Sequence, residues 1–91
     1  MSKIIRRATA GTLESSDVFV TLEPHDSGVE IELDSVVRNQ FGPAILKAVE
    51  EVLAECGVNS AKVIVVDRGA LDCVIRARVE TAVERPQATM P

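Results

Sequence analysis

The strongest constraint on the fold is a change in the spacing of apolar residues along the chain. In residues 18–23 and 29–34 every second residue is apolar and the residues between them are polar apart from Phe19, a pattern typical of strands that bury one face. From Val37 to Cys56 the apolar residues recur every three or four positions, which predicts a long helix that ends on Gly57 as a left-handed cap. The sequence therefore places strands before the first helix.

The remaining elements are less regular. Residues 8–14 are weakly strand-like, and we expect a hairpin turn about Ser15 and Ser16 before the next strand. The β-branched run 61–66 shows no alternation, which predicts an inner strand, either covered on both faces or placed centrally in the sheet. Apolar residues between Leu71 and Val83 then mark one face of a second helix, until Pro86 ends it.

Two features affect where the first helix starts. Asp34 or Ser35 is placed to cap it. Pro43 has no N–H for the carbonyl of Asn39 and its ring crowds that turn, so we expect a kink or break near residues 41–43 and a main helix that begins at Pro43.

The element order predicts a two-layer α+β fold. An antiparallel strand meander is followed by helix, strand and helix, with both helices packed on the sheet. The chain of 91 residues is expected to be a single domain spanning residues 1–91, with a core of about residues 8–85 and a flexible tail at 86–91.

Composition excludes several classes of function. Ten Lys and Arg against fourteen Asp and Glu give a formal charge of −4, which argues against nucleic-acid binding and suits a partner with a basic surface. No apolar run approaches the roughly 18 residues that span a bilayer, and no signal peptide is recognisable, so a soluble, cytoplasmic protein is expected. Cys56 and Cys73 have no partners at metal-ligand spacing and are expected to be buried free thiols, which also fits a reducing compartment.

The best position for covalent chemistry is the polar turn at residues 11–17. There Ser15 lies between Glu14 and Asp17, an exposed hydroxyl on a short loop held by strands. An ordinary hairpin turn explains the same residues, since Gly, Ser and Asp favour turns for backbone reasons alone.

No catalytic residue and no metal site are predicted. The one histidine, His25, lies in the next turn, and consecutive hairpin turns fall at opposite ends of a sheet, so it is not expected to reach Ser15. Glu30, Glu32 and Asp34 are expected to form the solvent-exposed face of a strand and not a metal site.

The arginines of the second helix, Arg76 and Arg78, are expected to be solubilising or ion-paired, although such a pair also suits an anionic partner.

Three segments together resemble one known family. Residues 11–18 (Gly-Thr-Leu-Glu-Ser-Ser-Asp-Val), the Gln-Phe-Gly of residues 40–42, and residues 67–80, which contain the distinctive Gly-Ala-Leu-Asp-Cys block, are similar to the citrate lyase acyl carrier proteins, the gamma subunits of that enzyme. The order and spacing of the segments agree over residues 8–85.

The resemblance implies a non-catalytic carrier subunit of a bacterial lyase that cleaves citrate to acetate and oxaloacetate. In that family the serine closing the Gly-Thr-Leu-Glu-Ser motif, here Ser15, carries phosphoribosyl-dephospho-coenzyme A through a phosphodiester bond that a separate prosthetic-group transferase forms. The thioester of this arm shuttles acetyl and citryl groups between the alpha subunit, a transferase, and the beta subunit, a lyase.

Several residue roles stay open at this point. Ser16 is the neighbouring hydroxyl that has to be excluded as the attachment site, and Glu14 and Asp17 are possible docking charges or simple turn formers. Cys73 is expected to be a packing residue and not a second acyl site. A small non-covalent regulatory or scaffold domain is the alternative function, and a free-standing hydrolase would need His25 near Ser15.

Overall fold

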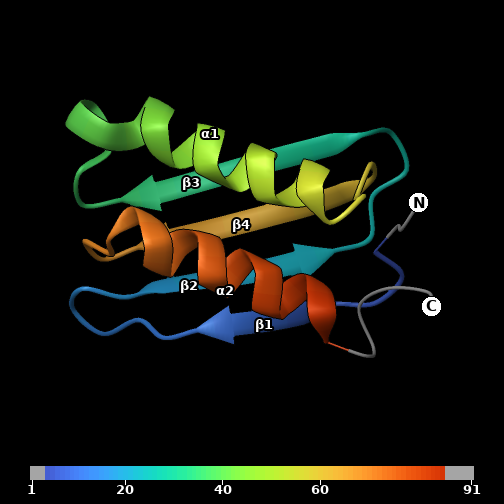
Figure 1. Ribbon diagram of the computed structural model, residues 1–91, viewed down its shortest axis with the longest axis horizontal. Coiled ribbons are helices and arrows are strands. Elements are labelled where there is room, and N and C mark those ends of the chain that lie inside the picture. Colours follow the sequence, from blue (N-terminus) through green and yellow to red (C-terminus); the bar gives the residue numbers. More distant parts are fainter. Residues whose placement is uncertain (1–3, 86–91) are drawn as a thin grey trace.

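A computed structural model describes residues 4–85 and shows two layers, a four-stranded sheet with two helices on one face (Figure 1). The elements follow one another as β1 (Ala8–Gly11), β2 (Val18–Glu23), β3 (Val29–Ser35), α1 (Arg38–Glu55), β4 (Ala61–Asp67) and α2 (Asp72–Glu84). The predicted two-layer α+β class and the predicted order of elements are confirmed. The proposed tail at residues 86–91 lies outside the described residues.

The order of strands in the sheet is β1-β2-β4-β3. β1 and β2 form the expected antiparallel hairpin, and β4 pairs antiparallel with β2 and parallel with β3. β3 is therefore not the neighbour of β2 that a continuous meander would make it. A parallel pair needs a crossover of a dozen or more residues, and the 18-residue helix α1 provides it between β3 and β4.

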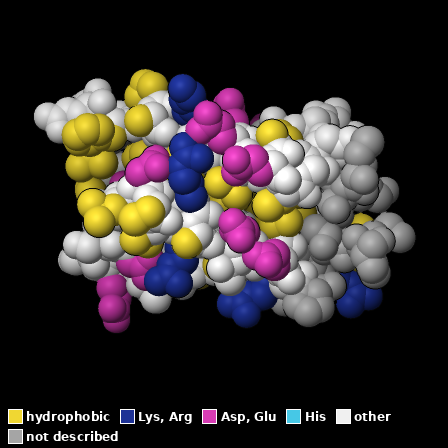
Figure 2. Space-filling view, in the orientation of Figure 1, with side chains coloured by type: hydrophobic (Ala, Val, Ile, Leu, Met, Phe, Trp, Pro, Cys, Tyr) yellow, Lys and Arg dark blue, Asp and Glu magenta, His cyan; other side chains and the backbone are white. Residues whose placement is uncertain are grey.

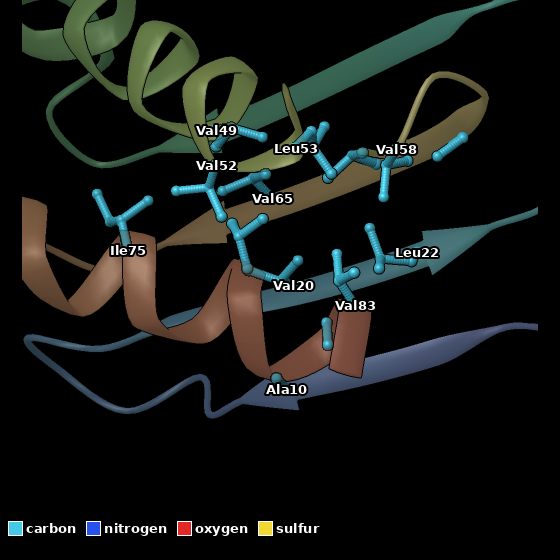
Figure 3. Packing of buried hydrophobic residues seen from close by; sticks show 14 of the residues in the cluster. Ala10, Val20, Leu22, Val49, Val52, Leu53, Val58, Val65, Ile75 and Val83 are labelled. Atoms are coloured by element: carbon cyan, nitrogen blue, oxygen red, sulfur yellow. The ribbon is translucent and has the colours of Figure 1, made fainter. Parts of the chain in front are cut away.

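The core lies between the sheet and the helices, and it is entirely aliphatic (Figure 3). Alternate residues of the two central strands point toward the helices, so that Val20, Leu22 and Val65 are fully buried. They meet Val49 and Val79 on the inner faces of α1 and α2, which are also fully buried. Both helices of residues 4–85 lie on this face of the sheet, so each helix needs one apolar stripe.

Two strands differ in burial from the sequence-based expectation. β4 is central, one of the two alternatives predicted, and its residues alternate between buried and half-buried because no helix within residues 4–85 covers the second face of the sheet. In β3 the expected inner face is only half-buried at Ile31 and Leu33, and Val29 is 40% exposed. β3 is an edge strand, and α1 alone shields it.

The expected start of the first helix is wrong. α1 begins at Arg38 and runs through Pro43 without a break, and no side chain caps it. Pro43 lies in the second turn, so only the carbonyl of Asn39 loses its donor, and Asn39 is exposed to water. The predicted end is confirmed: Gly57 has φ 73°, and the N–H groups of Gly57 and Val58 donate to carbonyls of the last turn, forming a Schellman motif.

Candidate functional site

The loop between β1 and β2 projects from one end of the sheet and presents Ser15 at its tip. Ser15 is exposed, and the following residue, Ser16, has a left-handed backbone with φ 65°. The Ser16 N–H donates to the Arg68 carbonyl (2.8 Å), and the Arg68 N–H donates to the Asp17 carbonyl (2.9 Å). These two bonds continue the pairing of β2 with β4 past the strand ends. They hold Ser16 and Asp17, and so the base of the loop, in place against Arg68.

The Asp17 side chain fixes the loop from the inside. Its Oδ2 accepts the Thr12 hydroxyl (2.7 Å), and its Oδ1 accepts the Val18 N–H (2.7 Å). Arg78 on α2 adds two further bonds, from Nε to Oδ1 (3.1 Å) and from Nη2 to Oδ2 (3.2 Å). The bonds from Thr12 and Val18, with those from Arg78, lower the pKa of Asp17 to about 2. The carboxylate therefore remains charged at physiological pH.

The two acidic residues near Ser15, Glu14 and Asp17, differ in how accessible their carboxylates are to a partner protein. Glu14 is exposed. The Asp17 side chain is only 14% exposed, and both of its oxygens accept hydrogen bonds from the protein. The sequence gives no reason to distinguish the two residues, whereas in the structure the hydrogen bonds of Asp17 stabilise the loop.

Asp67, at the end of β4, organises the other loops at this end of the molecule. Its side chain is fully buried; Oδ2 accepts the Ser35 hydroxyl (2.8 Å) and Oδ1 accepts the Ala70 N–H (2.9 Å). Its backbone carbonyl accepts the Val36 N–H (3.2 Å). A buried carboxylate is tolerated when its oxygens are hydrogen-bonded. Asp67 thus joins the β3–α1 and β4–α2 connections beneath the Ser15 loop.

His25 lies far from Ser15, as the sequence predicted. The loops that carry the two residues lie at opposite ends of β2 (Figure 1), and the His25 carbonyl accepts the Ser60 hydroxyl. Within residues 4–85 no three His, Cys, Asp or Glu side chains are grouped to hold a metal ion. His25 is therefore not placed to act as a base for the Ser15 hydroxyl.

The expected burial of the cysteines is wrong. Cys56 is half-buried and Cys73 is exposed, and both are free thiols. Cys73 lies in the first turn of α2, away from the stripe of Ile75 and Val79 that faces the core. Burial, together with the nearby carboxylates of Glu80, Glu84 and Glu55, raises the pKa of the Cys56 thiol.

Sequence reasoning missed the residues that support the loop. The turn pattern of residues 11–17 gives Thr12 no role of its own, and Asp67 enters only as part of residues 67–80, which resemble the known family. Arg78 was expected to be solubilising or ion-paired, without a partner. The available signal was that all three lie in the segments quoted for the family resemblance.

The chain resembles known proteins over most of its length. The ACP family model, described as malonate decarboxylase delta subunit (MdcD), matches residues 5–86. Citrate lyase acyl carrier proteins of Rhodopseudomonas palustris and Haemophilus influenzae (strain PittEE) are 52% and 57% identical, each over 91% of this chain and 86% of the relative. The carrier of Escherichia fergusonii is 54% identical over 91% of this chain and 87% of its own length.

A solved structure shares the fold. In the crystal structure of a Pseudomonas malonate decarboxylase hetero-tetramer in complex with malonate, one chain is 28% identical to this one, with a TM-score of 0.76. The match covers 87% of this chain and 81% of that chain. No helix in residues 4–85 is long and apolar enough to cross a membrane.

The family model matches residues 5–86, and the citrate lyase carriers named above are 52–57% identical to this chain. The chain therefore belongs to the acyl carrier protein family that includes the citrate lyase carriers and the malonate decarboxylase delta subunit.

Proposed function

We propose that this protein is the acyl carrier subunit of a cytoplasmic citrate lyase and carries phosphoribosyl-dephospho-coenzyme A on Ser15 through a phosphodiester bond. The observation that carries the proposal is the position of Ser15, an exposed hydroxyl at the tip of a loop whose base is hydrogen-bonded to Arg68, just after β4, and to Arg78 on α2. The identity of 52–57% to citrate lyase carriers, against 28% to the malonate decarboxylase chain, favours citrate lyase as the parent enzyme.

The residues around Ser15 fit such a group. A transferase has to reach the hydroxyl, and Ser15 stands free on the surface. Attachment places a phosphodiester anion beside Asp17, and Arg78 neutralises that carboxylate through two hydrogen bonds. The negative charge of the phosphodiester is therefore placed near a neutralised ion pair, which reduces its repulsion by the Asp17 carboxylate.

The role of the carrier in the reaction is to present the acyl group to the catalytic subunits. When attached, the group supplies a thiol that holds acyl groups as thioesters. The alpha and beta subunits of the lyase would receive the arm in turn, and tethering raises the effective concentration of the acyl group at each active site. Ser15 anchors the arm, Asp17 and Arg78 keep the anchor at a fixed distance from the body, and Glu14 is the exposed charge available to a basic partner surface.

The decisive experiment is the intact mass of the protein after co-expression with its cognate prosthetic-group transferase. We expect an added mass equal to the phosphoribosyl-dephospho-coenzyme A group, and peptide mapping should place it on Ser15. Ser15→Ala should remain folded and unmodified, whereas Ser16→Ala should still be loaded. An unmodified chain, with a transferase that is active on another carrier, would contradict the proposal and favour a non-covalent scaffold.

A further inference from the structure

A groove opens between the first turns of the two helices, at the same end of the molecule as Ser15. Its volume is about 350 Å³. Ile45 and Ile75, both nearly fully buried, form its floor, and Phe41 and Leu71 form its walls. Small residues leave it hollow, since Ala44 lies on the α1 side and Gly69 and Ala70 on the α2 side.

The walls of this groove expose large apolar side chains to water. Phe41 is 53% exposed and Leu71 is 71% exposed. Figure 2 shows hydrophobic side chains gathered at the end of the molecule where α1 and α2 begin. Large apolar side chains that leave this much surface in water, close together, mark a place where something binds.

The groove begins directly beside the base of the Ser15 loop. The Ser16 N–H donates to the carbonyl of Arg68, and the next three residues after Arg68 line the groove. Asp67 fixes this connection through its bond with the Ala70 N–H. A flexible group attached to Ser15 therefore starts next to the groove.

The shape and lining favour a slender ligand over a protein surface. The groove is concave, apolar and within the range of volumes typical of small-molecule sites. Its one charged lining residue, Asp72, is held by Arg76, whose Nε lies 2.7 Å from Asp72 Oδ2 and whose Nη2 lies 2.6 Å from Glu51 on α1. This bridge links α1 to α2 at the surface of the molecule.

We infer that the groove receives the thiol end of the arm attached to Ser15, an aliphatic, amide-containing chain, while the arm is not engaged by a catalytic subunit. The inference rests on the proposed function. Phe41 and Leu71 would cover the aliphatic chain, and an acyl thioester held between them would be shielded from hydrolysis by water. The arm leaves the groove when a partner's active site binds it more tightly.

The test compares methyl NMR spectra of the unloaded and loaded protein, after intact mass has established loading on Ser15. We expect loading to shift the methyl signals of Ala44, Ala70 and Leu71, with contacts from the arm to the same methyl groups. In Ala44→Leu, which fills the groove from an exposed helix position, the shifts at Ala70 and Leu71 should be lost. In the matched variant Ala54→Leu, exposed near the other end of α1, they should persist.

Two results would overturn the inference without touching the proposed function. One is a loaded protein in which the shifts are confined to residues 12–17. The other is an unloaded protein in which the groove methyls respond to an added catalytic subunit while loading leaves them unchanged, which would make the groove a protein docking site. Absence of loading on Ser15, by contrast, would refute the proposed function itself.

Discussion

Arg78 holds Asp17 in a bidentate ion pair, although 61 residues separate them in the sequence. The guanidinium Nε and Nη2 lie 3.1 and 3.2 Å from the two carboxylate oxygens. This pair joins the loop that carries Ser15 to helix α2. Bidentate arginine–carboxylate pairs fix orientation as well as charge, so the attachment site has a defined direction relative to the body of the protein.

Arg78→Gln should slow loading by the transferase while leaving the protein folded. Without the guanidinium the loop loses its link to α2, and a misplaced reacting group costs between about 10- and 100-fold in rate. The measurement is kcat/KM of loading, followed by intact mass, with circular dichroism as the test of folding. Arg76→Gln is the matched control, because it removes an equal charge and a two-partner ion pair from the same helix, away from the loop. Equal loading rates for the two variants would contradict a positioning role for Arg78.

The ion pair at Asp17 should also make stability depend on pH in acid. The folded-state pKa of about 2 lies below the ordinary value of 3.8 for an aspartate side chain, so the charged carboxylate stabilises the folded state above pH 4. That contribution is lost as the pH falls through the folded pKa. We therefore expect the difference in Tm between the wild type and Asp17→Asn to be largest near neutral pH and to shrink between about pH 4 and pH 2. A difference that does not change across this window would show that the charge of Asp17 does not stabilise the loop.

Gly11, where β1 enters the loop, should not tolerate a side chain. Its φ is +94°, and a Cβ atom would lie 1.8 Å from the Val18 carbonyl oxygen. We expect Gly11→Ala to lower the free energy of unfolding by about 3 kcal/mol or more, measured by urea denaturation. Gly28→Ala is the matched comparison: φ is +83° but no heavy atom lies within 4 Å, so only the backbone cost of about 1 to 2 kcal/mol applies. Equal losses would mean that the loop relaxes around the new methyl group.

Alkylation should distinguish the two cysteines. Cys73 is exposed, whereas Cys56 is half-buried and its thiol pKa is raised, so less thiolate is present to react. At neutral pH, iodoacetamide should modify Cys73 first, as peptide mapping would show. Protein alkylated at Cys73 should still accept the prosthetic group on Ser15. Loss of loading after this modification would assign Cys73 a place in the contact with the transferase.

Local patterns predicted most of the elements. Alternation at residues 18–23 and 29–34 gave strands, and the three- and four-residue spacing after Val37 gave a helix that ends on Gly57. These patterns are local, because the spacing of apolar residues along a helix or strand shows which face of that element is buried. Pro43 shows the limit of such rules, because a proline in the second turn removes one hydrogen bond and the packing of Ile45, Val49 and Val52 maintains the helix around it.

The sequence by itself determined the class of the fold, the ends of most elements and the loop on which Ser15 stands. Only the tertiary structure decided that β4 lies between β2 and β3, that Arg78 reaches Asp17, and that a groove opens beside the Ser15 loop. The reason is that each of these features depends on segments far apart in the chain. Periodicity shows which face an element buries, whereas the choice of what it is buried against is made by the packing of the whole molecule.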